Sequence, residues 1–524
     1  MFEDATVVTT EGLEALVSAL SRVGSRGERG STTDQERVDQ LAVLERVKSA
    51  VAAAQVRLTA AFVRSQEQVA QAWLDRAREC SDAGDFDGWR AARAHARAAS
   101  FDDEGATTGQ RTTRPRRRGP SGLTGVAAQV ALARHESPVR GAQHVRLALA
   151  LTEEMPHTLA ALEAGEVTEW RAQLIVTETA TLTSEQRTLV DAEVACPMRE
   201  AGGGGEQVGA LGERELARRV RAVAYRIDAA SVMARAAKAE AERRVTIRPA
   251  PDTMAYVTAL LPVAQAVAAH AALTAAADTA RAGGDERGKG QVMADTFVTR
   301  LTGQPTADAV PVEVQVVMTD RALLAGDSAP AQLPGYGTLP AAWARDLLTP
   351  RAPDSVNEGS AGARVWLRRL YTHPDTGTLV AMDSTRRTFE AGLRRYLLTR
   401  DAGTCRTPWC DAPARHLDHI HDHADGGLTT ATNGQGLCVR CNHTKQLPGF
   451  TAEVLPARQP GAPHTVRTTT PTGHTYASEA PPLLPGTTTD AVGRRPDARP
   501  GVPELLAQDL LSPVERYFTL AIAA

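Results

Sequence analysis

Two closely spaced pairs of cysteines set the strongest constraint on how the C-terminal part of this 524-residue chain can fold. Cys405 and Cys410 are separated by four residues, and Cys438 and Cys441 by two. Each spacing lets both sulfurs of a pair turn inward on a tight knuckle, and two knuckles supply the tetrahedral set of thiolates that Zn²⁺ prefers in structural sites. Free thiols are the alternative, whereas disulfides do not fit a chain without secretory features. The spacing therefore predicts a structural zinc ion that has no open position for hydrolysis.

The segment between the two pairs, RHLDHIHDHADGGLTTATNGQGL, carries side chains suited to phosphodiester hydrolysis. A hard divalent cation needs oxygen ligands, which the Asp418 carboxylate and the Asn442 side-chain carbonyl can supply. A neutral imidazole can take a proton from the attacking water near pH 7, and His419 stands next to this aspartate. Neighbouring residues of a strand face opposite ways, so both serve one site only where the strand ends. Asn433 is expected to pin the intervening loop and to orient the imidazole.

The pattern DHI, GG, N and LCxxCNxxK between cysteine pairs resembles the motif of HNH (ββα-metal) endonucleases. The resemblance implies His419 as general base, Asn433 as the orienting residue, and Asp418 and Asn442 as ligands of a catalytic Mg²⁺ or Mn²⁺. His443, one residue further along, is the alternative ligand. The resemblance also implies that the four cysteines hold structural Zn²⁺.

Two longer stretches, EMPHTLAALEAGEVTEWRAQLIV and STRRTFEAGLRRYLLTRDAGTCRTPWC, extend the likeness. They are similar to a bacterial family that joins a long helical domain of unknown function to a C-terminal HNH module. This likeness spans residues 123–450 and implies architecture, without adding active residues in the helical part. The expected activity is metal-dependent hydrolysis of phosphodiester bonds in DNA.

Local charge has to provide any affinity for nucleic acid, because the whole chain carries a net charge of −3. Between residues 386 and 445, nine Arg or Lys side chains stand against six Asp or Glu, an excess that a bound divalent cation would increase. Arg415, Arg440 and Lys445 are the predicted phosphate contacts. A non-catalytic alternative stays open, namely a zinc-framed DNA-binding or regulatory protein whose arginines grip phosphate.

Hydrophobic spacing predicts a mainly α-helical chain with small β-hairpins. Helical periodicity runs from about Val38 to Phe62, and a second helix is expected to follow to about Ser100. Alternation predicts a hairpin in RRVTIRPAPDTMAYVTALLP, a strand in VPVEVQVVM and another hairpin in RVWLRRLYTHPDTGTLVAM. We divide the chain into a helical domain (1–345, with a loop at 101–120), a connecting hairpin and helix (346–400), the HNH module (401–450), and a Pro/Thr/Gly-rich tail with a short terminal helix (451–524). Within the tail, residues 456–500 are predicted to be extended or disordered.

The longest uncharged run, residues 257–277, has the length of a membrane span. Pro262, Gln265, His270 and many alanines make it a poor span, so we predict a buried helix. The N-terminus lacks a basic segment followed by an apolar core, so we expect no signal peptide and a cytoplasmic protein without a membrane partner. DNA is the expected partner of the C-terminal module, and the helical domain is a candidate platform for homodimerisation.

Overall fold

The computed structural model describes residues 9–21, 23, 33–99, 125–196, 208–304, 318, 322, 327–333, 337–348, 389–457, 459 and 462–482. Over these residues the protein is mainly helical, with small antiparallel sheets of two or three strands. The predicted loop at 101–120, the strand at 310–318 apart from Met318, the hairpin near 364–382 and the terminal helix lie outside the described residues. The α-helices are α1 (Thr10–Leu20), α2 (Asp34–Asp82), α3 (Phe86–Ala99), α4 (Gly125–Ala133), α5 (Pro138–Glu153), α6 (Pro156–Ala164), α7 (Glu169–Glu178), α8 (Ser184–Ala195), α10 (Glu213–Ile227), α11 (Ala229–Ala241), α12 (Val263–Ala282), α13 (Lys289–Thr302), α15 (Ala341–Leu348), α16 (Ala391–Arg400) and α17 (Val439–Lys445). The strands are β1 (Arg244–Pro249), β2 (Ala255–Leu260), β3 (Ala331–Leu333), β4 (Gly337–Leu339), β5 (His416–His419), β6 (Gly434–Leu437), β7 (Thr451–Leu455), β8 (Thr465–Thr469) and β9 (Thr475–Glu479).

The long helix α2 forms the spine of the N-terminal part. It begins at a capping box in which Thr33 and Glu36 satisfy each other's backbone N–H groups. The prediction of one helix ending near Phe62 and a second reaching Ser100 placed the break wrongly. The helix continues to Asp82 because no Gly or Pro interrupts it, and the chain turns back at Gly84, whose φ of 71° favours glycine.

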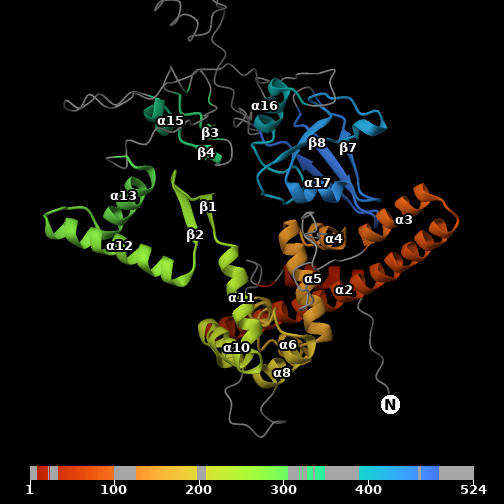
Figure 1. Ribbon diagram of the computed structural model, residues 1–524, viewed down its shortest axis with the longest axis horizontal. Coiled ribbons are helices and arrows are strands. Elements are labelled where there is room, and N and C mark those ends of the chain that lie inside the picture. Colours follow the sequence, from red (N-terminus) through yellow and green to blue (C-terminus); the bar gives the residue numbers. More distant parts are fainter. Residues whose placement is uncertain are drawn as a thin grey trace, which may run out of the picture.

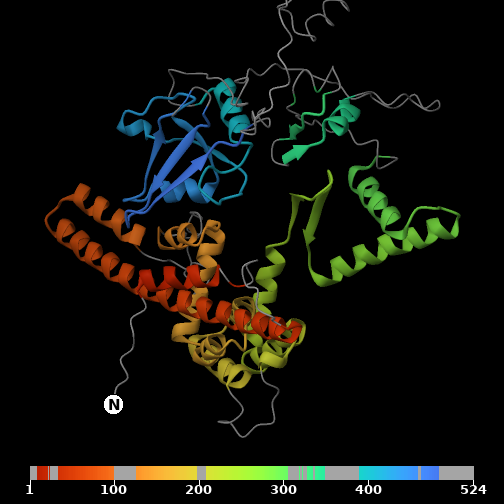
Figure 2. The ribbon, with the colours of Figure 1, turned by 180° about the vertical axis from the view of Figure 1, so that it is seen from behind.

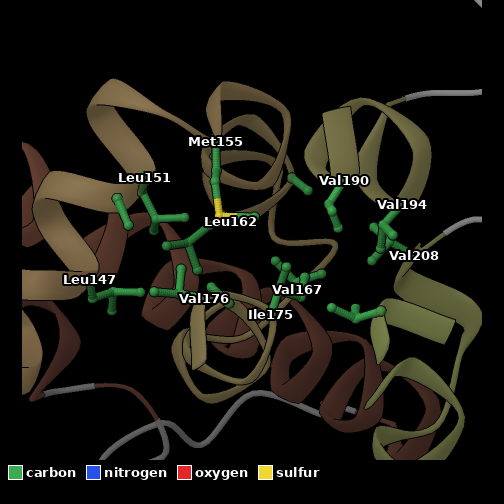
Figure 3. Close-up of a cluster of buried hydrophobic side chains, with 14 of the residues drawn as sticks. Leu147, Leu151, Met155, Leu162, Val167, Ile175, Val176, Val190, Val194 and Val208 are labelled. Carbon is green, nitrogen blue, oxygen red and sulfur yellow. The ribbon is translucent and has the colours of Figure 1, made fainter. Parts of the chain in front are cut away.

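The main hydrophobic core lies where α2, α5, α6, α7, α8 and α10 meet (Figure 3). Small side chains such as Ala53, Ala60 and Ala148 are completely buried, which lets these helices approach closely. Larger side chains fill the remaining space, and full burial of each stabilises the fold by about 1.5–3 kcal/mol. Those drawn and labelled are Leu147, Leu151, Met155, Leu162, Val167, Ile175, Val176, Val190, Val194 and Val208.

The segment from β1 to α13 projects from α11, away from this core (Figures 1 and 2). The predicted hairpin is present as β1 and β2, with Ile247 opposite Val257 and a turn at Asp252 and Thr253. The prediction of a buried helix over 257–277 is wrong: its first residues belong to β2, and α12 is mostly exposed along its length. Periodicity alone cannot tell a buried Ala-rich helix from an exposed one, because alanine fits both environments. No described helix combines the length and apolar character needed to cross a membrane.

The C-terminal strands correct another prediction. Residues 456–500 were expected to be extended or disordered, but in the described part of this range β8 and β9 pair with β7 in a three-stranded antiparallel sheet in which β8 is central, and residues 483–500 lie outside the described residues. The many threonines that suggested a solvated tail favour strands, and Val466 at the middle of the sheet is buried. The Arg406 guanidinium donates to the carbonyls of His464 and Ser478 and joins this sheet to the cysteine-bearing segment.

The C-terminal unit, from α16 to β9, packs on α4 and α5 of the helical part (Figures 1 and 2). The Trp409 ring stacks on the His135 ring with centroids 4.2 Å apart and an interplanar angle of 11°. The Thr472 hydroxyl donates to Gln129 Oε1 at 2.8 Å. These contacts fix the unit on the helical part by both apolar and polar interactions.

Candidate functional site

The four cysteines of the two pairs converge on one point. Their sulfur atoms all lie within 4.8 Å of one another. Cys410 Sγ is 3.8 Å from Cys438 Sγ and 3.6 Å from Cys441 Sγ. A tetrahedron of thiolates with Zn–S bonds of about 2.3 Å has edges of about 3.8 Å. The four thiols could therefore bind a metal ion such as zinc, and the separations are too long for disulfides.

The chain forms the knuckles by local hydrogen bonding. The Cys405 N–H donates to the Ala412 carbonyl, and the Cys441 N–H donates to Cys438 Sγ as α17 begins. Hydrogen bonds with the Cys405 and Cys410 thiols lower the pKa of Cys438. Hydrogen bonds with the same two thiols raise the pKa of Cys441. Four thiols this close cannot all ionise without a cation to neutralise them.

Between the two pairs the chain forms a β-hairpin followed by a helix. β5 and β6 are antiparallel, with Asp418 opposite Gln435 and His419 opposite Gly434. His419 is the last residue of β5. The strand therefore ends at Asp418 and His419, the two neighbouring residues that were expected to serve one site. The helix α17 starts two residues after β6 and packs on both strands.

One face of α17 meets one face of β5. Asn442 Nδ2 lies 3.1 Å from His416 Nδ1, and one helical turn later Lys445 Nζ lies 3.0 Å from Asp418 Oδ2. Asn442 Oδ1 is buried and makes no hydrogen bond with any described residue, whereas the buried Asp418 Oδ2 is paired with the Lys445 ammonium. A buried oxygen is normally satisfied by a donor or by a cation, and carboxylate and amide oxygens are the ligand types that hard divalent cations prefer.

His419 is half-buried on the opposite side of the strand end. Its Nε2 lies 2.8 Å from Thr429 Oγ1, and its ring packs on the Phe389 ring with centroids 4.5 Å apart. Burial lowers the pKa of His419, against the opposing effect of the Asp418 charge. A cleft of about 430 Å³ opens here, lined by Phe389, Arg394, Leu417, Asp418, His419, Asp422, His423, Ala424 and Gln446.

Asn433 holds the loop that follows β5. Its Oδ1 accepts from the His421 N–H at 2.8 Å, and its Nδ2 donates to the carbonyls of His421 at 3.0 Å and Leu428 at 2.8 Å. A Cβ atom at Gly427 would lie 2.9 Å from Asn433 Nδ2 and 1.9 Å from the His421 carbonyl oxygen, so only glycine fits there. The amide therefore closes the loop, and its hydrogen bonds go to the backbone of His421 and Leu428, not to the His419 ring.

The predicted phosphate contacts lie in three different environments. Arg415 is exposed and Arg440 is partly buried near the cysteines, where burial lowers its pKa. Lys445 points inward: its ammonium donates to the His419 carbonyl at 2.6 Å and to Asp422, and pairs with Asp418. With a side chain only 11% exposed, Lys445 fastens α17 to the strand end instead of reaching toward solvent, which corrects its assignment as a phosphate contact. The alternative ligand His443 is exposed, and its ring centroid lies 6.5 Å from that of His416.

A buried ion pair that the sequence analysis did not predict is hydrogen-bonded to strand β6 of the β5–β6 hairpin. The Arg400 guanidinium pairs with Asp401 and donates to the carbonyls of Ala431 and Gly434. Asp401 is completely buried and also accepts from the Gly436 N–H at 2.8 Å. In the sequence these residues look like ordinary helix-surface charges, so only packing could have revealed them.

Arg406 shares this buried region. Burial lowers its pKa to about 10, although the Asp401 carboxylate partly opposes the effect. Two cations and one carboxylate thus lie under the hairpin, and backbone carbonyl oxygens accept hydrogen bonds from both guanidinium groups.

The architecture is thus a helical domain followed by a small unit that carries four clustered thiols and an adjacent cleft. Residues 90–401, more than half of the chain, match the family described as a domain of unknown function, DUF222. The chain therefore belongs to the DUF222 family. The matched region includes α16 and ends at Asp401, four residues before Cys405. Comparison with curated proteins and with solved structures gave no match.

Proposed function

We propose that this protein is a metal-dependent endonuclease of the HNH type that hydrolyses phosphodiester bonds in DNA. The observation that carries the proposal is the presence of two buried oxygens on the facing surfaces of β5 and α17: Asn442 Oδ1, which has no hydrogen bond among the described residues, and Asp418 Oδ2, whose charge is met only by Lys445. The order of hairpin and helix supports the proposal, because it is the order of a ββα-metal unit. The half-buried imidazole of His419 at the adjacent strand end supplies a suitable base.

In this proposal Asp418 and Asn442 hold Mg²⁺ or Mn²⁺, and His443, which is exposed, is the alternative to Asn442. When bound, the ion supplies stabilisation of negative charge on the phosphate and on the leaving oxygen. His419 Nε2 lies 2.8 Å from Thr429 Oγ1, and the proposed mechanism uses the tautomer in which Nε2 donates to this hydroxyl, because that tautomer leaves Nδ1 to accept a proton from water. Burial lowers the pKa of His419 and so favours the neutral ring, which is the form that can accept a proton.

The four cysteines take a structural role, with Zn²⁺ held by Cys405, Cys410, Cys438 and Cys441. Asn442 directly follows Cys441 on α17, so the thiolate frame determines where its amide lies. All four coordination positions are filled by sulfur, so this ion does no hydrolysis.

The proposal is tested by incubating the purified full-length protein with supercoiled plasmid and Mg²⁺ or Mn²⁺. The wild type should nick the plasmid, and His419→Ala should be slower by roughly 10²- to 10⁴-fold, the usual contribution of a general base. His421→Ala is the matched control: this histidine is exposed two residues away, and only its backbone contacts Asn433. It should nick like the wild type.

A non-catalytic DNA-binding protein would give a different pattern. All three proteins would bind DNA in a salt-sensitive manner, and the plasmid would stay intact with every cation. Equal nicking by the wild type and His419→Ala would remove the role assigned to His419.

A further inference from the structure

The helix α16 forms one wall of the cleft next to His419. Leu393 and Leu397 on its inner face are buried against Ala431. The contact with β6 is close: a Cβ atom at Gly434 would lie 2.5 Å from Leu397 Cδ1. This packing, together with the buried Arg400, determines which residues α16 presents to the cleft.

Arg394 is the residue of α16 that reaches the cleft. It is exposed and lines the same cavity as Asp418 and His419. Its neighbour Arg395 is equally exposed but does not line the cavity, because one residue turns a helix by about 100°. The two arginines therefore have the same charge and helix and differ in direction.

The carboxylates around the cleft would repel an anionic substrate, so a side-chain cation that faces the cleft would favour its binding. Asp418 and Asp422 line the cleft, and the one nearby lysine, Lys445, is already bonded to both and to the His419 carbonyl. Among the described residues that line this cavity, Arg394 is the only Arg or Lys. A phosphate entering the cleft would meet the Arg394 guanidinium as the available donor, with the planar fork that suits phosphate oxygens.

We propose that Arg394 is a substrate-binding residue that contacts a phosphate of the nucleic-acid backbone in the cleft beside His419. The inference rests on the proposed nuclease function and deepens it. Because residue 394 lies within the region that matches DUF222, the family domain itself contributes to the cleft, and a fragment starting at the cysteines would lack this contact.

The test measures binding of the full-length protein to a duplex over a series of NaCl concentrations. His419→Ala serves as the background, so that the duplex stays intact. Adding Arg394→Ala should weaken binding about tenfold at 0.1 M salt and reduce the slope of log K against log [salt] by about 0.9, the value for one lost phosphate contact. Arg395→Ala is the matched control and should change neither quantity. Arg394→Lys should keep the slope, since the charge remains.

The outcomes separate this inference from the proposed function. With His419 intact, nicking that is equal in wild type, Arg394→Ala and Arg395→Ala would overturn the assignment of Arg394 and leave the nuclease standing. A specific loss of binding with Arg394→Ala, in a wild type that never nicks, would overturn the nuclease and sustain the phosphate contact. A wild type that binds no DNA would overturn both. Unchanged zinc content and melting temperature will show that Arg394→Ala is folded.

Discussion

Replacing Asn433 by alanine gives the most direct test of how the loop beside the candidate base is held. The substitution removes three hydrogen bonds, two to the backbone of His421 and one to the Leu428 carbonyl. These bonds are partly exposed, so each contributes about 0.5–1 kcal/mol, and their loss should lower the free energy of opening the loop by about 1.5–3 kcal/mol. That corresponds to a roughly 10- to 150-fold faster exchange of the protected amides, since about 1.4 kcal/mol changes an equilibrium constant tenfold.

The assay is hydrogen–deuterium exchange followed by mass spectrometry of peptides covering residues 420–430. The amides to follow are those of His421, bonded to Asn433 Oδ1, and Gly427, bonded to the Asp422 carbonyl. Peptides from β8 should not change, because that strand is paired on both sides. Asn433→Asp keeps the acceptor for His421 and loses both donors, so its exchange should lie between those of wild type and Asn433→Ala.

Unchanged exchange in Asn433→Ala would refute the reasoning, because the loop would then be held by other contacts. A matching rise in β8 would also refute it, because the substitution would then have loosened the whole C-terminal unit.

Three further outcomes follow from the structure. Cys441→Ala should remove the bound metal, measured by elemental analysis as a fall from one zinc per chain. It should also destabilise β5, β6 and α17 by roughly 3 kcal/mol or more, because a structural zinc site contributes folding energy. Full zinc content in the variant would contradict the four-thiol site. Burial lowers the pKa of His464 to about 4, below the ordinary value of about 6.5, so the stability that its neutral form contributes is complete above pH 6.5 and is lost as the pH falls toward 4, by up to about 3 kcal/mol. His464→Gln should therefore flatten the plot of unfolding free energy against pH in this range. An unchanged plot would contradict the burial argument. Trp409→Ala removes the stack on His135 and the edge contact with Tyr476, which together contribute about 1–3 kcal/mol. Hydrogen exchange of the α4 amides should therefore increase while the zinc content stays the same. Unaltered α4 exchange would show that this stack does not hold the C-terminal unit on the helical part.

Much of the candidate site could be predicted because its chemistry is local in the chain. The spacing of Cys438 and Cys441 determines a knuckle, and the position of Asn442 directly after it places the amide on the helix that the knuckle starts. The end of the strand at His419 and the pinned loop at Asn433 were also expected, although Asn433 contacts the loop backbone and not the imidazole.

Lys445, Arg394 and the exposed α12 show what the pattern of residues could not decide. A lysine after the last cysteine looks like a phosphate contact, yet its ammonium is directed inward by Asp418, Asp422 and a backbone carbonyl. The sequence does not distinguish the adjacent residues Arg394 and Arg395. The packing of Leu393 and Leu397 orients α16 so that Arg394 lines the cleft and Arg395 does not.

The sequence by itself determined the helical composition, the two cysteine knuckles and the order of hairpin and helix around the candidate base, because each depends on residues a few positions apart. Only the tertiary structure decided which cation faces the cleft, which charges are buried under the hairpin, and that the Thr-rich segment after α17 forms a sheet. The physical reason is that the direction and burial of a side chain depend on surfaces contributed by distant parts of the chain, and local spacing carries no information about them.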